Sequence, residues 1–175
     1  AKYRPHEVTL ETRADGTCLY RSGHAMGPVA RRTGDWLHRW AIEAPERVFL
    51  AERSGAGWRE ERYGGALEKV RALAGALLAR GLNADTPILI LSGNGVDHGL
   101  LALAGQYAGI PTVPVAEQYS LIHGAHGRLR HAIGLIRPAM AYAVDAAQYG
   151  AALALEAFEG IELVASRTHW RPGVT

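Results

Sequence analysis

The second half of the chain alternates short apolar runs with helical patterns, and this alternation constrains the fold more than any other feature. The apolar runs and the helical segments between them lie at 87–91, 96–109, 110–115, 125–137, 139–144, 145–158 and 161–166. Strands that are apolar throughout are typical of a sheet buried on both faces. Helices between such strands favour right-handed parallel crossovers. The expected fold class is α/β, with a mostly parallel sheet and crossover helices.

The first half predicts two β-hairpins and a short helix. Asp15-Gly16 lies between alternating runs and favours a hairpin turn, and a second hairpin is expected to turn at 54–57. A short helix follows the Gly- and Pro-rich linker, with Thr33 or Asp35 as its N-cap and its end marked by Pro45. Its predicted apolar stripe is Trp36, Leu37, Trp40 and Ala41.

The clearest single helix covers residues 64–82, and the last helix covers 145–158. The first carries a predicted apolar face of Leu67, Val70, Leu73, Leu77 and Leu78. Gly81 is expected to close it as a C-cap. Asp145 is the expected N-cap of the last helix.

Composition narrows the class of protein. The 175 residues carry a formal net charge of +2 with Lys and Arg scattered, so a nucleic-acid partner is not expected. Cys18 is the single cysteine, which excludes an intrachain disulfide and fits a reducing compartment. The N-terminus lacks the apolar run of a signal peptide, and no run is long enough to span a membrane. We therefore expect a cytoplasmic protein with no membrane partner.

We expect one main domain. Residues 1–32 form an N-terminal hairpin and linker, and residues 33–175 form the α/β part. We find no internal repeat and no boundary strong enough to separate a second domain.

Gly93 and Gly95 raise the question of nucleotide binding, because they form a turn between an apolar strand and a helix. Free N–H groups at a helix N-terminus suit a phosphate, and Glu117 follows at the distance expected of a ribose-binding acid. However, the spacing G-x-G-x-x-x-G differs from the dinucleotide pattern, and every βαβ unit needs a tight turn. A stand-alone Rossmann-like module using Gly93, Gly95 and Glu117 stays open as an alternative.

Four segments resemble one family in order and spacing. They are "RTGDWLHRWAIEAPERVFLAER", "ALEKVRALAGALLARGL", "PILILSGNGVDHGLLALAGQYAGIPTVPVAEQYSL" and "GRLRHAIGLIRPAMAYA". Together they resemble the opening of the adenylate-forming (AMP-binding) acyl-CoA synthetases, and most of all the feruloyl-CoA synthetases. The resemblance implies the large N-terminal domain of that fold. It also implies a turn at Gly93 and Gly95 that is scaffold rather than phosphate cradle.

The resemblance further implies an ATP-dependent carboxylate–CoA ligase that acts on an aromatic acid such as ferulate. In that family the phosphate loop, the adenine-binding motif, the ribose-binding aspartate and a catalytic lysine come later along the chain, and none is in these 175 residues. We therefore expect the N-terminal portion of such an enzyme, inactive by itself. ATP, Mg²⁺ and CoA belong to the parent enzyme, and none is expected to bind this chain tightly.

Few residues are candidates for a site, and none is a candidate for catalysis. Tyr119 and Ser120 follow a strand's carboxyl end and are the best candidates for a substrate entrance. His123, His126 and His131 have a loose metal-ligand spacing, but Gly124 and Gly127 argue against a firm helix there, and no metal site is expected. Cys18 lacks a nearby histidine and His98 fits a packing role.

The expected partner is the remainder of the parent enzyme. If the chain ends at Thr175, later strands would be missing and apolar faces would need another cover. The members of these faces that the pattern predicts are Leu67, Leu73, Leu77, Leu103 and Ile136. The exposed sheet edge leaves open a homo-oligomer or a non-catalytic interaction domain.

Overall fold

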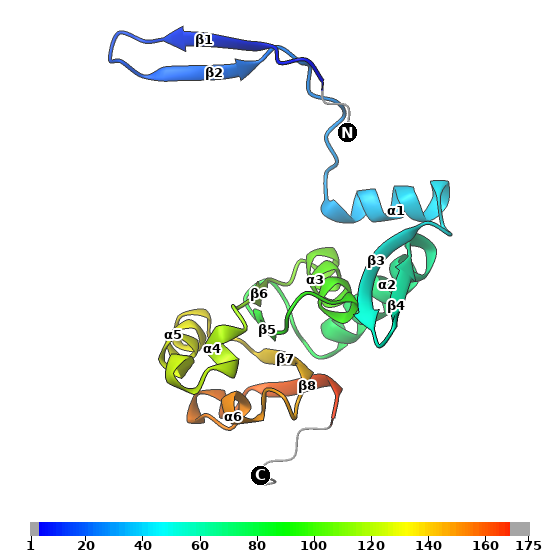
Figure 1. The fold of residues 1–175 in the computed structure, drawn as a ribbon, viewed down its shortest axis with the longest axis vertical. Helices are drawn as coiled ribbons and strands as arrows, with labels where there is room; N and C mark the ends of the chain where they lie inside the picture. Colours follow the sequence, from blue (N-terminus) through cyan, green and yellow to red (C-terminus); the bar gives the residue numbers. More distant parts are fainter. Residues whose placement is uncertain (1–3, 169–175) are drawn as a thin grey trace. The chain divides into compact units, whose positions relative to one another are not determined.

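The structure is a computed structural model that describes residues 4–168. Its contacts divide the chain between Arg31 and Arg32 into two compact units. The first unit holds an antiparallel hairpin of β1 (Val8–Thr12) and β2 (Cys18–Ser22) (Figure 1). Gly16 has a φ of +82° in the turn, and the Asp15 carboxylate accepts a hydrogen bond from the Thr17 N–H at 2.9 Å. The predicted hairpin at Asp15-Gly16 is confirmed.

The second unit begins with α1 (Thr33–Glu43). Its N-cap is Arg32, whose backbone N–H donates to Asp35 at 3.1 Å, so the prediction of Thr33 or Asp35 as N-cap is wrong. Asp35 instead lies in the first turn, where the positive end of the helix dipole stabilises a carboxylate. Leu37 is buried, but Trp36 is 47% exposed and lies outside the buried stripe.

A second hairpin and a long helix follow. Strands β3 (Val48–Ser54) and β4 (Gly57–Arg62) pair across Gly55-Ala56, with Gly55 at a φ of +58°, which confirms the turn at 54–57. Helix α2 (Tyr63–Ala79) buries Ala66, Val70, Ala74 and Leu77. Gly81 follows its end at a φ of +79°, and its N–H donates to the Leu78 carbonyl at 2.9 Å.

The predicted apolar face of α2 is partly wrong. Leu73 is 36% exposed and Leu78 is 51% exposed, while the alanines Ala66 and Ala74 are buried. The prediction followed the leucines, but the buried face of α2 is formed in part by alanines. Their small side chains allow α2 to pack closely on its neighbours. The exposed leucines flank the buried stripe on either side.

Four strands form the main sheet in the order β6-β5-β7-β8, and every pair is parallel. They are β5 (Ile88–Leu91), β6 (Thr112–Pro114), β7 (Met140–Asp145) and β8 (Glu162–Arg167). All of β5 is buried, as its unbroken apolar run predicts. The predicted α/β class with a mostly parallel sheet is confirmed.

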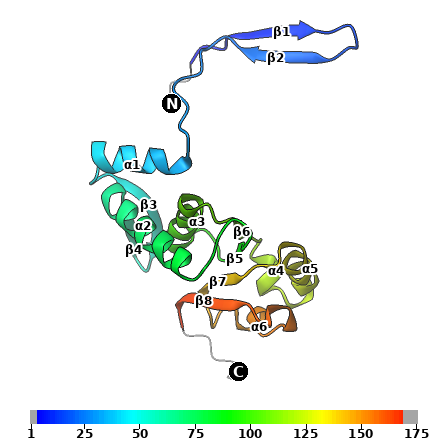
Figure 2. The ribbon, with the colours of Figure 1, turned by 180° about the vertical axis from the view of Figure 1, so that it is seen from behind.

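Helices cover both faces of this sheet (Figure 2). On one face α2 and α3 (Val96–Ala108) pack against Ile88, Ile90 and Met140. On the other face α5 (His126–Ile136) and the segment around α6 (Gly150–Leu153) pack against Leu89, Leu91 and Ala141. Alternate residues of the central strands therefore serve two cores. None of the helices within residues 4–168 is long and apolar enough to cross a membrane.

The helix predicted at 145–158 is wrong. Asp145 ends β7, and its carboxylate accepts a hydrogen bond from the Ala147 N–H at 2.9 Å, which makes a local turn. Only α6 and a 3₁₀ turn, η2 (Glu156–Phe158), are helical. Leu155 is extended between them, with a ψ of 139°. This arrangement lets Tyr149, Ala152, Leu153 and Phe158 all reach the same core.

Candidate functional site

The candidate site lies at the carboxyl end of the sheet, where β5 gives way to α3. The chain leaves β5 toward α3 on one face, whereas it leaves β7 toward α6 on the other face. In open α/β sheets a crevice forms at such a switch between neighbouring strands, and ligands bind there. The turn 92–95, with Gly93 and Gly95, lies beside this point.

The structure brings Gly93 and Glu117 together. A Cβ on Gly93 would lie 2.7 Å from Oε2 of Glu117, so the carboxylate rests directly on the glycine backbone. The Tyr149 hydroxyl donates to Oε1 of Glu117 at 2.9 Å. Burial, together with the neighbouring Glu117 carboxylate, raises the pKa of Tyr149 well above its ordinary value.

Gly95 faces a different carboxylate, from the β3–β4 hairpin. The Val96 N–H donates to Oε2 of Glu52 at 2.8 Å, so a strand residue caps the first turn of α3. A Cβ on Gly95 would lie 2.6 Å from that oxygen. Gly95 has an extended backbone with a φ of −163°, so contact rather than backbone conformation requires glycine there.

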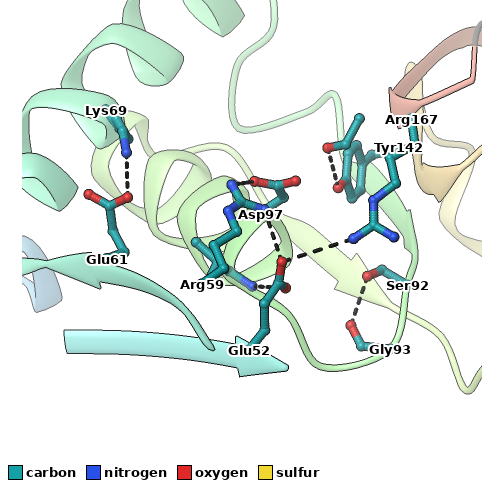
Figure 3. A network of polar contacts seen from close by, with 11 residues as sticks. Glu52, Arg59, Glu61, Lys69, Ser92, Gly93, Asp97, Tyr142 and Arg167 are labelled. Atoms are coloured by element: carbon teal, nitrogen blue, oxygen red, sulfur yellow. Dashed lines mark hydrogen bonds and ion pairs between the residues drawn. The ribbon is translucent and has the colours of Figure 1, made fainter. Parts of the chain in front are cut away.

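An ionic network extends from Glu52 across three elements (Figure 3). Arg59 of β4 donates to Glu52 at 3.0 Å and to Asp97 in the first turn of α3. The Arg167 guanidinium at the end of β8 lies 4.0 Å from Glu52. The hydrogen bond from Arg59 holds the pKa of Asp97 below its ordinary value.

A hydroxyl pair, of buried Tyr142 and exposed Ser166, adjoins this network. The Tyr142 and Ser166 hydroxyls are 2.8 Å apart, and Ser166 also helps to lower the pKa of Asp97. Burial raises the pKa of Tyr142. The carbonyl of Gly93 accepts from the Ser92 hydroxyl at 2.7 Å and lies 3.1 Å from Nδ1 of His98. His98 is therefore tied to the turn's backbone.

This arrangement limits what the turn can bind. The Glu52 carboxylate takes the N–H at the start of α3, and the Glu117 carboxylate fills the space over Gly93. A phosphate would need the same space and would be repelled by both negative charges. The geometry favours a packed crossover turn over a phosphate cradle.

Tyr119 and Ser120 lie in the short helix α4 (Gln118–Leu121). Tyr119 is half-buried, with the Arg128 guanidinium 5.5 Å from its ring centre. Ser120 is only 3% exposed, and its hydroxyl has no hydrogen-bond partner among the described residues. Tyr119 also packs against the core that contains Leu129 and Tyr149, so both neighbours contribute to the interior on this face of the sheet.

The histidines do not converge. The His123 and His126 rings are 5.1 Å apart, and Nε2 of His126 lies 3.0 Å from the Ser120 carbonyl oxygen, while His131 is exposed. Helix α5 begins at His126, which confirms the helix predicted at 125–137, whereas the argument from Gly127 against a firm helix is wrong. Within residues 4–168 no three His, Cys, Asp or Glu side chains are grouped to hold a metal. Cys18 is exposed on β2.

Sequence reasoning missed Glu52, Arg59, Asp97 and Tyr149. The turn at 54–57 carried a usable signal, because it sets Glu52 directly opposite Arg59 in the hairpin register. Nothing in the local sequence links this pair to Asp97, which is brought close by tertiary packing. Tyr149 was hidden by the helix wrongly predicted around it.

Comparison with solved structures identifies the fold. A fatty acyl-adenylate ligase from L. pneumophila, in complex with acyl adenylate and pyrophosphate, matches with a TM-score of 0.66 at 17% identity. The match covers 78% of this chain and 23% of that one. A benzoate CoA ligase from Burkholderia xenovorans LB400 matches with a TM-score of 0.62 at 19% identity, over 78% of this chain and 26% of that one.

The N-terminal subdomain of Klebsiella oxytoca NpsA, in complex with 3-hydroxyanthranilyl-AMSN, has a TM-score of 0.60 at 16% identity. That match covers 77% of this chain and 31% of the subdomain. No protein-family model and no curated protein matches the chain. The chain thus has the fold of part of the adenylate-forming ligases and spans about a quarter of the length of the first ligase chains it matches.

Proposed function

We propose that this chain is the N-terminal portion of an ATP-dependent carboxylate–CoA ligase. The main support is the structural match to a fatty acyl-adenylate ligase, which covers 78% of the chain with a TM-score of 0.66. The four sequence segments that resemble acyl-CoA synthetases lie within the same α/β unit, in the same order as its elements. Fold and sequence resemblance therefore support one assignment.

The proposed reaction has two steps. The substrate carboxylate attacks the α-phosphate of ATP, forming an acyl adenylate and releasing pyrophosphate. The thiol of CoA then attacks the acyl carbon, which forms the thioester, releases AMP and gives up the thiol proton. The mixed anhydride makes a poor electrophile reactive. We propose an aromatic acid such as ferulate as substrate, on the resemblance to feruloyl-CoA synthetases.

This chain's own residues are proposed to be scaffold. The acidic side chains at the start of α3 are bonded to arginine or to backbone N–H, so they do not form a free ligand set for Mg²⁺. We propose that the remaining ligase polypeptide binds ATP, Mg²⁺ and CoA. The parent enzyme would work in the cytoplasm. Tyr119 and Ser120 remain the proposed residues of the substrate entrance.

The 175-residue chain should form no acyl-CoA from ATP, CoA and ferulate. The reason is that the expected phosphate loop and catalytic lysine are absent from its sequence. Thioester formation would be followed by absorbance and by mass spectrometry, in a preparation free of full-length enzyme. Turnover above a buffer blank would contradict the proposal.

The parent activity needs a second experiment. The complete open reading frame would be expressed and assayed for AMP and acyl-CoA with ferulate, benzoate and a fatty acid. Ferulate should give the highest kcat/KM. A reading frame without ligase activity would reject the proposed function, and a preference for the fatty acid would reject only the aromatic substrate.

The alternative nucleotide-binding module is tested by calorimetry. Titration of the chain with NAD or ATP should give no micromolar binding, because carboxylates occupy the space over both glycines. Micromolar affinity that disappears in Glu117→Ala would favour the alternative. Glu159→Ala, at an exposed glutamate beyond η2, is the matched control.

A further inference from the structure

Helix α5 differs in charge from the rest of the chain. No aspartate or glutamate lies between Glu117 and Asp145, although the chain has 17 acidic residues, and the same stretch contains three arginines and three histidines. The exposed residues of α5, which form its outer side, are Gly127, Arg128, Arg130, His131, Gly134 and Leu135. A further exposed arginine, Arg137, follows the end of the helix. The outer side of α5 thus carries positive charge that its own segment does not balance.

The other elements do not balance this charge either. Among residues 4–168 none of the three arginines forms an ion pair, whereas Arg80 of α2 holds Glu162 at 3.1 Å. The guanidinium of Arg128 lies against the Tyr119 ring instead. Glu156 of η2, which packs beside α5, pairs with none of them. These arginines are therefore available to an anionic partner.

Charge also distinguishes the outer side of α5 from a face that a missing element would cover. The inner side of the helix is apolar, with Leu129 and Ile133 buried against the sheet. Covering Arg128 and Arg130 with an apolar element would bury unpaired charges, which costs several kcal/mol. The outer side is therefore not an interior face that the end of this sequence leaves bare.

The shape of the outer side favours a helix as the partner. Since an α-helix turns about 100° per residue, Arg128 and Arg130 lie on opposite flanks of the exposed side. Gly127 and Gly134 lie between these flanks, and nothing lies within 4 Å of either Cβ position. Two helices approach most closely where the side chains between them are small. A bilayer would instead be held by inserted aliphatic and aromatic side chains, which glycine cannot supply.

We propose that the outer side of α5 binds an acidic α-helix of a partner protein. The partner lies along Gly127 and Gly134, and its carboxylates meet Arg128 on one flank and Arg130 on the other. Leu135, which is 75% exposed, supplies an apolar contact at one end. Attraction between opposite charges speeds association and makes it sensitive to salt. This inference does not rest on the ligase function proposed above.

The test uses the protein from the complete reading frame and a fluorescent helical peptide of about 20 residues, with a leucine stripe flanked by glutamates. The peptide should bind at low salt, with a Kd that rises as salt screens the charges. Replacing both Arg128→Glu and Arg130→Glu should raise the Kd at least about tenfold. Arg71→Glu is the matched control, because Arg71 is exposed on α2, which packs on the other face of the sheet.

Gly134→Gln tests close docking separately from charge. Glutamine suits a helix interior better than glycine, so this variant should not lose stability. Its side chain would occupy the open space at Gly134 and should also raise the Kd at least about tenfold. Unchanged binding by Gly134→Gln would reject the position of the partner along the two glycines. Circular dichroism melts of each variant would establish that the fold is retained.

Four other outcomes would overturn the proposal. Absence of peptide binding at low salt would reject an acidic helix as partner, and equal binding by the double arginine variant would place the contact elsewhere. Binding by the 175-residue chain but not by the complete protein would mean that another segment of the same polypeptide covers α5. Cosedimentation with vesicles of phosphatidylserine and phosphatidylcholine, without peptide binding, would assign the arginines to a membrane surface.

Discussion

Two glycines at the start of α3 show how contact, rather than backbone conformation, can require a missing side chain. Neither Gly93 nor Gly95 has a positive φ, so an L residue could adopt their backbone angles. What excludes a side chain is the pair of carboxylates from distant elements, Glu117 over Gly93 and Glu52 over Gly95. Displacing either carboxylate would break a hydrogen bond that it accepts.

Gly93→Ala and Gly95→Ala should each destabilise the fold by about 1–3 kcal/mol, the usual cost of forcing extra atoms into a packed site. The new methyl group would lie 2.7 Å from Glu117 or 2.6 Å from Glu52. Chemical denaturation with urea would measure the change. Gly75→Ala is the control, because nothing lies within 4 Å of its Cβ and alanine favours a helix interior. A destabilised Gly75→Ala would indicate that the loss is not specific to the turn.

Tyr149→Phe tests the contact that holds Glu117 in place. At neutral pH the loss of its hydrogen bond to a carboxylate should cost about 1.5–3 kcal/mol. Because the folded state raises the pKa of Tyr149, its contribution is full below the ordinary tyrosine value of 10.0 and declines as the pH rises above it.

The parent chain should therefore lose stability more steeply above pH 10 than Tyr149→Phe does. Urea midpoints across the alkaline range would measure both slopes. Tyr20→Phe serves as control, since Tyr20 is 72% exposed on β2. If stability falls equally steeply with pH in the parent and in Tyr149→Phe, the pKa of Tyr149 is not raised in the folded state.

At the scale of elements, the β3–β4 hairpin is joined to α3 by charge as well as by packing. Glu52 caps the helix, and Arg59 connects that carboxylate to Asp97 in the first turn. The pair Arg59 and Asp97 is partly exposed, so its contribution should be about 1 kcal/mol or less. The hairpin thus supplies the cap that α3 lacks in its own sequence.

Arg59→Gln should change how stability depends on acid. A lowered pKa makes the Asp97 contribution full above the ordinary aspartate value of 3.8, and the contribution is lost as the pH falls through the folded-state value below it. Without Arg59 most of this loss should disappear. Arg53→Gln, on the other strand of the hairpin with its guanidinium 4.5 Å from the Trp58 ring centre, is the control. Urea midpoints would be measured from neutral pH to below pH 3.8. If the Arg59–Asp97 pair contributes nothing, the midpoints of the parent and of Arg59→Gln would fall in parallel.

The elements themselves divide into those that local sequence determines and those that packing determines. Strands β5 and β7 and helix α3 follow from unbroken apolar runs and helical spacing, and both hairpins follow from their turns. The segment after β7 does not, because the alanines and leucines from 145 to 158 suit a helix equally well. Tyr149 must enter the core and meet Glu117, and this tertiary demand breaks the helix into α6 and η2.

At the scale of the whole molecule, the predicted sheet was right, but the site at its carboxyl end could be foreseen only in part. Gly93 and Glu117 were singled out from spacing, and the structure does bring them together. Their relation is packing, which spacing alone cannot distinguish from ligand binding. Asp97 and Arg167 are separated by 70 positions, so only the order of the strands places them in one network.

The two cores of residues 32–168 should unfold as one unit, because β5 and β7 send alternate side chains into both. Leu129→Ala, at a fully buried position of α5, should therefore weaken the α2–α3 side equally. Its expected cost is about 2–5 kcal/mol. Trp36, Trp40 and Trp58 all belong to α1 and β4, so their fluorescence reports unfolding on the α2–α3 side.

Trp170, the fourth tryptophan of the sequence, is replaced by phenylalanine so that only the other three report. In this Trp170→Phe background, tryptophan fluorescence and far-ultraviolet circular dichroism should give one coincident transition, before and after Leu129→Ala. Leu135→Ala, on the same helix but 75% exposed, should leave that transition in place. If Leu129→Ala instead moves the circular dichroism curve while the fluorescence midpoint stays fixed, the two faces fold separately. In that case the shared strands would not couple the cores, and α5 and α6 would be able to come apart from the sheet without disturbing α2 and α3.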